Sequence, residues 1–319
     1  MLAIVAPRNT SSDIKRPAAA VGDAGALAEA GVPMPAKIGA GVAAGKTKLG
    51  VRRSRSYIPL DRTTLRILAC PAEPMNTPIT VSENYEALSQ RAADRIRVAL
   101  ARKPNLLLCA AGGGSPARTY ELLVEQQHRD PAAFAALRVV KLDEWGGLPM
   151  DDPGSCETQL RSTLLMPLAI SEDRCFGFRS DAADPGAECA RVRQRLAVEG
   201  AIDLCVLGLG VNGHVAMNEP APHLPPFAHV ARLSEESLHH PMLAQSKIQP
   251  THGLTLGLGE ILASREILLL VSGQVKRAPL RRLLNREITT AFPASFLWLH
   301  PHWTLLCDRE ATAGLDLHV

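Results

Sequence analysis

The stretch IDLCVLGLGVNGHVAMNEP, residues 202–220, decides the fold of this chain. It begins with a short apolar run that ends in glycines, which is the pattern of a strand buried on both faces of a sheet. Four further runs of this kind occur along the chain, namely NLLLCAA (105–111), RVVKLDE (138–144), EILLLVSG (266–273) and WTLLCD (303–308).

The stretches between these runs have the periodicity of helices. The segment ENYEALSQRAADRIRVALAR, residues 83–102, carries apolar residues at helical spacing and predicts an amphipathic helix. Buried strands that alternate with helices predict an α/β fold: a doubly wound, Rossmann-like domain whose mostly parallel sheet has helices on both faces. Ligands of such folds bind at the carboxyl ends of the strands, and the unusual residues of this chain follow directly after its apolar runs.

The N-terminal part of the chain has a different composition. The stretch 16–50 is rich in Ala, Gly and Pro and has almost no large apolar residues, so it lacks the material for a core. We therefore expect residues 1–74 to be a disordered extension and residues 75–319 to form a single α/β domain. The segment LRILACPAEPMNT, residues 65–77, is either a short strand or part of the extension, and Met75 is an alternative start of translation.

Charge and cysteine usage exclude several classes of protein. The formal net charge is only +3, which does not indicate binding to nucleic acid or to a membrane surface. The seven cysteines occur singly, without a CxxC pair, so a secreted disulfide scaffold is not predicted. No apolar run approaches the roughly 18 residues that span a bilayer. We expect a cytoplasmic protein.

The segment AAGGGSPARTYELL, residues 110–123, predicts a phosphate-binding turn. Three glycines follow a buried strand, then Ser115 as a helix N-cap and Pro116 at the first helical position. Glycines let the backbone approach an anion, and a helix N-terminus offers free N–H groups. The alternative is an ordinary strand-to-helix turn. It is not a Walker loop, and neither is GVAAGKTKLG (41–50), because Ala40 stands where that motif needs glycine.

Adjacent acids end the run RVVKLDE. An aspartate at a strand end, shielded by a large neighbour such as Trp145, suits a general base, and Asp143 is the candidate. The alternative is that Asp143 and Glu144 are a solvated pair in a loop.

A lysine follows the run EILLLVSG. Lys276 is predicted in the first turn of a helix, where a cation opposes the helix dipole. An anionic ligand at the strand tip would explain that placement, and a solvated lysine is the alternative.

The glycines of GLGVNG, residues 208–213, match the GxGxxG pattern of a dinucleotide site. The long helix that should follow is excluded by Pro220 and the further prolines after it. Instead, His214 and Glu219 lie close together after a strand end, and a histidine beside an acid is a common proton shuttle. A histidine that merely caps a turn is the alternative.

In their order and spacing, these four segments are specific. Strand–GGGSP–helix, strand–LDEW–GLP, strand–GLGVNGHVAMNEP and strand–SGQVK–helix resemble the glucosamine-6-phosphate and galactosamine-6-phosphate deaminase/isomerase family over about residues 78–310. The stretches NYEALSQRA, VKLDEW, PGSCETQLR and ITTAFPASFLWLH resemble the galactosamine branch most. The glucosamine branch typically has Met-Asp-Glu-Tyr and Asp-Gly-His, where this chain has Leu-Asp-Glu-Trp and Asn-Gly-His.

The resemblance implies where the substrate phosphate binds. Gly113, Gly114, Ser115 and Lys276 would hold it. The glucosamine enzymes add an Arg from the segment after Asn-Glu-Pro, and the segment LSEESLHHPML has no clear equivalent. His239 or His240 would substitute, or the contact is absent.

The resemblance also implies catalytic roles. His214 would move a proton to the ring oxygen and open the pyranose, and Asp143 would shuttle a proton between carbon 2 and carbon 1. Glu219 would orient His214, and Asn212 stands where the glucosamine branch has an aspartate. An amide can hold geometry but cannot stabilise an imidazolium as a carboxylate does.

The expected activity is therefore conversion of galactosamine 6-phosphate to tagatose 6-phosphate and ammonia, without a metal or an organic cofactor. The alternatives are a glucosamine-6-phosphate deaminase, a hydrolase resembling 6-phosphogluconolactonase, and a non-catalytic sugar-phosphate sensor. The expected partner is a small hexosamine 6-phosphate, with no nucleic acid and no membrane. The sequence leaves a homo-oligomer open.

Overall fold

The computed structural model describes residues 79–315. The expected extension over residues 1–74, the alternative start at Met75 and the segment 65–77 lie outside the described residues.

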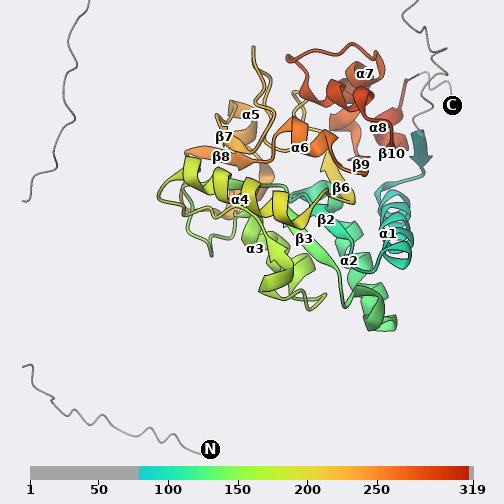
Figure 1. Cartoon of the computed structure of the whole chain (residues 1–319). Helices are drawn as coiled ribbons and strands as arrows, with labels where there is room; N and C mark the ends of the chain where they lie inside the picture. Colours follow the sequence, from blue (N-terminus) through green and yellow to red (C-terminus); the bar gives the residue numbers. More distant parts are fainter. Residues whose placement is uncertain (1–78, 316–319) are drawn as a thin grey trace, which may run out of the picture. The chain divides into compact units, whose positions relative to one another are not determined.

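A seven-stranded sheet forms the centre of the described chain, in the order β1-β10-β9-β6-β2-β3-β5 (Figure 1). Every neighbouring pair in it is parallel. Its strands are β1 (Ile79–Ser82), β2 (Leu107–Ala110), β3 (Arg138–Lys141), β5 (Cys175–Phe176), β6 (Leu204–Gly208), β9 (Glu266–Val271) and β10 (Trp303–Asp308). All five apolar runs contribute strands to this sheet, so the predicted parallel α/β fold is confirmed.

Helices cover both faces of the sheet because alternate side chains of each strand enter different cores. In β2, Leu107 and Cys109 belong to one core cluster, whereas Leu108 and Ala110 belong to the other. The first cluster also contains the apolar faces of α4 (Pro185–Glu199), α6 (Leu258–Leu262), α7 (Arg277–Leu284) and α8 (Arg309–Thr312). The second contains those of α1 (Tyr85–Arg102) and α2 (Gly114–Arg129), which lie together in Figure 1.

A second, antiparallel sheet was not predicted from the sequence. It consists of β4 (Asp143–Gly146), β8 (His252–Thr255) and β7 (His229–Ala231) in that order. The run RVVKLDE therefore does not form one strand, and the prediction that the two acids end a strand is wrong. Leu142 is the single residue between β3 and β4. Its N–H donates to the carbonyl of Ala110 in the parallel sheet, and its carbonyl accepts the N–H of Leu256, next to β8, so the chain passes from one sheet to the other at this residue. The two acids begin β4.

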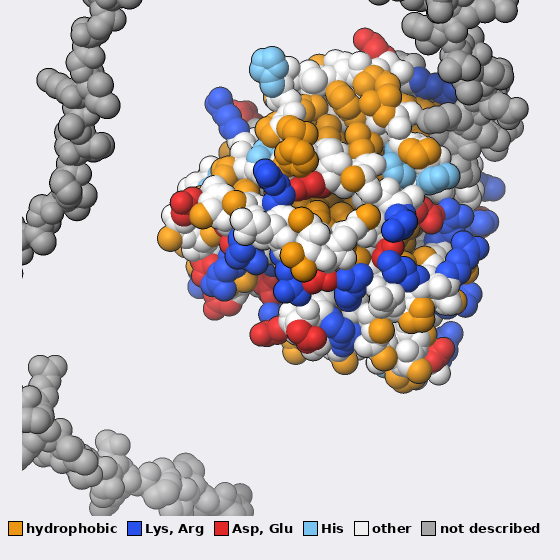
Figure 2. Space-filling model, viewed as in Figure 1, with side chains coloured by type: hydrophobic (Ala, Val, Ile, Leu, Met, Phe, Trp, Pro, Cys, Tyr) orange, Lys and Arg blue, Asp and Glu red, His pale blue; other side chains and the backbone are white. Residues whose placement is uncertain are grey.

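Short helical segments connect these elements. They are α3 (Cys156–Leu160), which continues into a π-helical turn η2 (Arg161–Leu165), α5 (Glu235–Leu238), and the 3₁₀ turns η1 (Pro131–Phe134), η3 (Glu172–Arg174), η4 (Pro241–Gln245), η5 (Gln274–Lys276) and η6 (Pro293–Leu299). Within residues 79–315, no helix is both long enough and apolar enough to cross a membrane. Figure 2 shows basic and acidic side chains interspersed over one face, with apolar side chains gathered near α7.

The centre of the sheet should dominate stability. Leu207 lies in β6 and is fully buried. We expect Leu207→Ala to lower the free energy of unfolding by about 3 kcal/mol, because it removes packed apolar atoms and leaves a cavity. Urea unfolding followed by circular dichroism measures this. Val198 on α4 is 82% exposed, so Val198→Ala is the matched control and should change stability by less than about 0.5 kcal/mol. Equal effects of the two substitutions would contradict this description of the core.

Candidate active site

A cavity of about 670 Å³ lies where the chain leaves the carboxyl ends of β2, β6 and β9. Six of the eight residues that the sequence singled out line it: Gly113, Gly114, Ser115, Asp143, His214 and Lys276. The other two, Asn212 and Glu219, do not line the cavity. Both lie next to His214, outside the cavity wall. The fold thus brings together segments that are far apart in the sequence.

The N-terminus of α2 forms one end of the cavity, and its cap differs from the prediction. Gly113 is the N-cap, with φ of +86°, and Ser115 is already the second helical residue. Glycine adopts this left-handed backbone without steric penalty, whereas serine would be strained there. The N–H groups of Gly114 and Ser115 occupy the first two helical positions, which have no acceptor inside the helix. Pro116, the third residue, has no N–H to satisfy.

Gln159 was not found by sequence reasoning, yet it fixes this turn. Its side-chain Oε1 accepts the N–H of Gly113 at 2.6 Å, and its Nε2 donates to the carbonyl of Gly113 at 3.4 Å. The N–H of Gly113 is therefore already occupied, which leaves the two following amides for a ligand. Nothing local in CETQL marks this glutamine, because its partner lies 46 residues away.

Two cationic or polar side chains face the same end. As predicted, Lys276 lies in the opening turn of a helix: it is the last residue of the 3₁₀ turn η5, which runs directly into α7. Its side chain lines the cavity, and burial lowers its pKa. His240 also lines the cavity, and its Nδ1 accepts the N–H of Met242 at 3.2 Å. The neutral ring therefore carries its proton on Nε2. A Cβ atom added to Gly113 would lie 3.8 Å from this Nε2, so the ring lies beside the turn.

The neighbouring His239 also lines the cavity, but its ring has a different environment. The Nδ1 atom of His239 lies 2.7 Å from the carbonyl oxygen of Glu235, and the side chain is exposed. Of the two histidines that the sequence offered, His240 has the more favourable position beside the turn at Gly113.

Asp143 forms a further part of the cavity wall. It is the first residue of β4, its side chain is partly buried, and it lines the cavity. Burial and the negative charge of Glu144 raise the pKa of Asp143 to about 7, although His214 and the Cys156 thiol act in the opposite direction. A carboxylate that titrates near neutral pH can both take and return a proton, as a general base requires.

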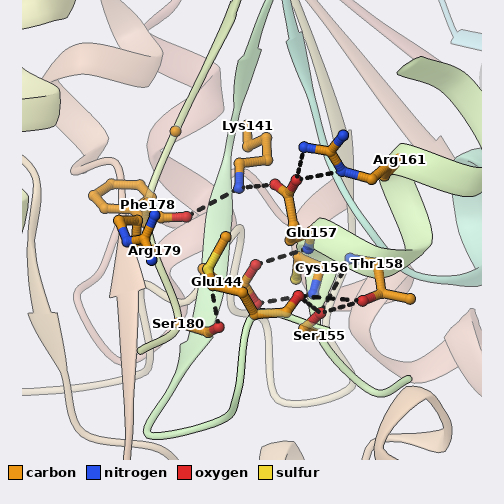
Figure 3. Close-up of polar contacts among 12 residues, drawn as sticks. Lys141, Glu144, Ser155, Cys156, Glu157, Thr158, Arg161, Phe178, Arg179 and Ser180 are labelled. Atoms are coloured by element: carbon orange, nitrogen blue, oxygen red, sulfur yellow. Dashed lines mark hydrogen bonds and ion pairs between the residues drawn. The ribbon is translucent and has the colours of Figure 1, made fainter. Parts of the chain in front are cut away.

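Glu144 has a structural environment, although it is the next residue. It is fully buried, and its carboxylate accepts the backbone N–H groups of Trp145 at 2.7 Å, Cys156 at 2.8 Å and Glu157 at 2.7 Å. Burial raises its pKa in spite of these hydrogen bonds. Figure 3 shows this carboxylate below the first turn of α3, which it therefore joins to β4.

A buried ion pair holds α3 from its other side. Lys141 is 4% exposed, and its ammonium group donates to the carboxylate of Glu157 and to the carbonyl of Phe178 (Figure 3). Glu157 also accepts from Arg161 at 2.9 Å. Sequence reasoning missed this pair, because Lys141 reads as part of an apolar strand. The pair ties α3 to the end of β3 and so fixes the side chains that α3 presents to the cavity.

The loop after β6 carries the histidine. His214 Nδ1 lies 3.5 Å from Glu219 Oε2 and has no hydrogen bond of normal geometry within the described part of the chain. Glu219 accepts from Asn212 at 2.8 Å and from the Ser237 hydroxyl. Burial works to raise the pKa of Glu219, but its contacts with His214 and these two donors outweigh burial and hold the pKa at about 2. Glu219 is therefore an anion beside the ring at any working pH.

Glycine is required next to this ring. A side chain on Gly210 would lie 2.5 Å from ring atoms of His214, closer than any real contact. The glycines of GLGVNG therefore make room for the histidine. Residues 209–228 contain no helix, so the GxGxxG pattern lacks the helix that a dinucleotide needs, as predicted.

Comparisons with known proteins show the family of this chain. The chain belongs to the family described as glucosamine-6-phosphate isomerases/6-phosphogluconolactonase, which matches residues 80–305. An Escherichia coli (strain K12) protein named "Putative deaminase AgaI" is 44% identical over 226 residues, which are 71% of this chain and 90% of that protein. A glucosamine-6-phosphate deaminase of Bacillus pumilus (strain SAFR-032) is 37% identical over 231 residues, 72% of this chain and 96% of that protein.

Solved structures show the same fold. The structure of a monomeric glucosamine-6-phosphate deaminase has a TM-score of 0.69 at 35% identity, covering 74% of this chain and 99% of that chain. The 6-phosphogluconolactonase from Trypanosoma brucei has a TM-score of 0.61 at 23% identity, covering 75% and 99%, and shares the fold.

The environment of Asp143 predicts an effect on stability. Its pKa is about 7 in the folded chain and near 4 in an unfolded one, so folding favours the protonated form. The contribution of Asp143 to the free energy of unfolding is therefore fully present below about pH 4, and it is lost as the pH rises from about 4 to about 7. We expect Asp143→Asn to raise the melting temperature at pH 8 by roughly 5 °C, and by less at pH 5. Calorimetry at both pH values measures this. Asp151→Asn, in the exposed loop after β4, is the control and should show no such difference.

Proposed function

We propose that this chain is a hexosamine-6-phosphate deaminase that isomerises galactosamine 6-phosphate and releases ammonia and tagatose 6-phosphate. The observation that carries the proposal is the content of one cavity: an aspartate with a pKa of about 7, the N-terminus of a long helix and a lysine all line it. The deaminase names of the relatives at 44% and 37% identity support the same chemistry.

The phosphate would bind at the N-terminus of α2. The N–H groups of Gly114 and Ser115, the ammonium of Lys276 and the Nε2–H of His240 are the donors available there. Gly113 would contribute through its left-handed turn, because its own N–H is held by the side chain of α3. A dianion beside these groups gains charge-assisted hydrogen bonds.

Ring opening would use the histidine. His214 would take the proton of the hydroxyl on carbon 1 and return a proton to the ring oxygen, so that the bond between carbon 1 and the ring oxygen breaks without net loss of charge. Glu219 lies 3.5 Å from Nδ1 and stays ionised, so it would stabilise the imidazolium that forms between the two transfers. Asn212 donates to Glu219 and accepts the N–H of His214, which fits a role in geometry rather than charge.

Isomerisation and deamination would follow on the open chain. Asp143 would remove the proton from carbon 2 and deliver it to carbon 1, while a second proton passes from the amine nitrogen to the oxygen on carbon 1. This converts the open-chain 2-amino aldose into the 2-imine of the corresponding ketose. Water would then add to carbon 2 and ammonia would leave. A carboxyl group with a pKa of about 7 suits both halves of this transfer.

The galacto preference rests on the branch motifs of the sequence. A glucosamine-6-phosphate deaminase is the second candidate, favoured by several relatives of that name. Since sugar phosphates do not cross membranes unaided, we place the reaction in the cytoplasm. We also propose that residues 75–319 act as one domain, because β1 at its start pairs with β10 near its end.

Ammonia release from the two epimers tests the substrate. We expect the purified protein to release ammonia from galactosamine 6-phosphate with a kcat/KM about tenfold or more above that for glucosamine 6-phosphate. A coupled ammonia assay measures both. The reverse preference would keep the mechanism and refute the branch assignment. Hydrolysis of 6-phosphogluconolactone without ammonia from either amino sugar would refute the proposed function.

Substitutions of the phosphate donors and of the base should affect different kinetic constants. Lys276→Ala should raise KM by roughly tenfold or more, and His240→Ala by a few-fold, because both remove donors to the phosphate. His223→Ala is the matched control, because His223 is exposed and does not line the cavity, and it should change KM by less than about twofold. Asp143→Asn should lower kcat by about 10³-fold with little effect on KM, because it removes the base. Near-normal turnover of this last variant would refute the role of Asp143.

A further inference from the structure

Three carboxylates lie together where β4 meets α3, and they have different donors. Glu144 accepts three backbone N–H groups, and Glu157 accepts Lys141 and Arg161. Asp143 has a much weaker partner. Over residues 79–315, its side chain accepts one hydrogen bond, from the thiol of a cysteine at 3.8 Å. Of the three, the carboxylate that faces the cavity is therefore the one without a strong donor.

That thiol belongs to Cys156, the first residue of α3. It is 3% exposed and lines the cavity, and its backbone N–H donates to Glu144 at 2.8 Å. Burial, followed by the negative charges of Glu144 and Asp143, raises the pKa of the Cys156 thiol well above its ordinary value. The thiol therefore stays protonated at any working pH. It can donate a hydrogen bond, and it cannot act as a thiolate nucleophile.

A weak donor suits a base that must stay basic. Each strong hydrogen bond to a carboxylate favours its charged form and lowers its pKa, and several together can bring it below 2. Lys141 and Arg161 outweigh burial and lower the pKa of Glu157, and donors of that strength would do the same to Asp143. A thiol is a weak donor, so it can fix the orientation of the carboxylate while leaving it able to take a proton from carbon.

We propose that Cys156 is a positioning residue for the base of the proposed deamination: its S–H holds the Asp143 carboxylate toward the cavity and leaves it basic. This inference rests on the proposed function for its kinetic consequence. The contact itself is independent of any substrate. The same helix carries Gln159, so α3 would orient the base at one end and the phosphate turn at the other.

The other titratable groups near Asp143 are consistent with this role. Glu144 on the same strand disfavours the charged carboxylate, and His214 from the loop after β6 favours it. Cys109 in β2 and Tyr120 in α2 are fully buried, and burial raises the pKa of both, so they stay neutral at working pH. The thiol is thus the contact whose strength a conservative substitution can change without altering charge.

Two substitutions of Cys156 test whether its thiol orients the Asp143 carboxylate or only fills space in the fold. Cys156→Ala removes the donor, so the pKa of Asp143 should rise and the acidic limb of the kcat/KM profile should move to higher pH. Its plateau kcat should fall by roughly tenfold, because a free carboxylate is less well placed. Cys156→Ser replaces the thiol with a stronger donor, so the limb should move to lower pH and most of kcat should return. Cys175→Ala, in β5 away from the cavity, is the matched control and should keep the wild-type profile.

The possible results test the role of Cys156 separately from the proposed function. An acidic limb that is the same in wild type and Cys156→Ala would overturn the role of the thiol, as would equal shifts in both variants at unchanged melting temperature. A wild-type protein that releases no ammonia would refute the proposed function alone. In that case the infrared S–H stretching band of Cys156, taken as the difference from Cys156→Ala, still tests the contact. It should shift as pH passes 7, and Asp143→Asn should abolish the shift. A band that does not respond to pH would overturn the contact.

Discussion

The parallel direction of all the strands in the main sheet is the constraint on which the site depends. Strands buried on both faces must be joined by crossovers, so every carboxyl end arrives at the same edge. That edge receives the glycine turn after β2, the acid after β3, the histidine loop after β6 and the lysine after β9. None of these segments is near another in the sequence. Their meeting follows from the topology, and the local residues decide only what chemistry is available there.

The charged groups of the site have different roles, and their hydrogen-bond partners differ accordingly. Amide N–H groups and a lysine provide positive potential in the cavity, while the carboxylate of Asp143, with its raised pKa, has no strong donor among the described residues. The neighbouring acids Glu144 and Glu157, in contrast, each accept several hydrogen bonds. Glu144 and Glu157 are fully bonded and hold α3 in place, so the charges that stabilise the structure are separate from the charge that would react. Glu219 is the exception, since it is an anion that serves the histidine.

The sequence predicted the strands of the main sheet wherever apolar runs were long, and it predicted six of the cavity residues, because glycines, acids and a lysine after such runs are unusual. It failed where an apolar run shows no break at the end of a strand. It also failed where the role of a residue depends on a partner far away in the sequence. Nothing in RVVKLDE marks Leu142 as the point where the chain changes sheets. Ser115 is the better cap by residue type, but the left-handed turn at Gly113 starts the helix earlier. Gln159 and Cys156 act through contacts made only in the folded chain.

The pairing of β1 with β10 has a consequence for how the protein is made. Ile79 leaves the ribosome long before Leu305, its partner in the sheet, has been synthesised. The strands β2, β3 and β5 can pair as soon as they emerge, but the edge of β6 stays open until β9 arrives, and β1 stays unpaired until the last strand follows. A nascent chain of this topology therefore exposes aggregation-prone strand edges through most of its translation. Of the described strands, β9 and β10 close the sheet and are the last to be synthesised, so the growing chain must avoid association with other chains until they emerge.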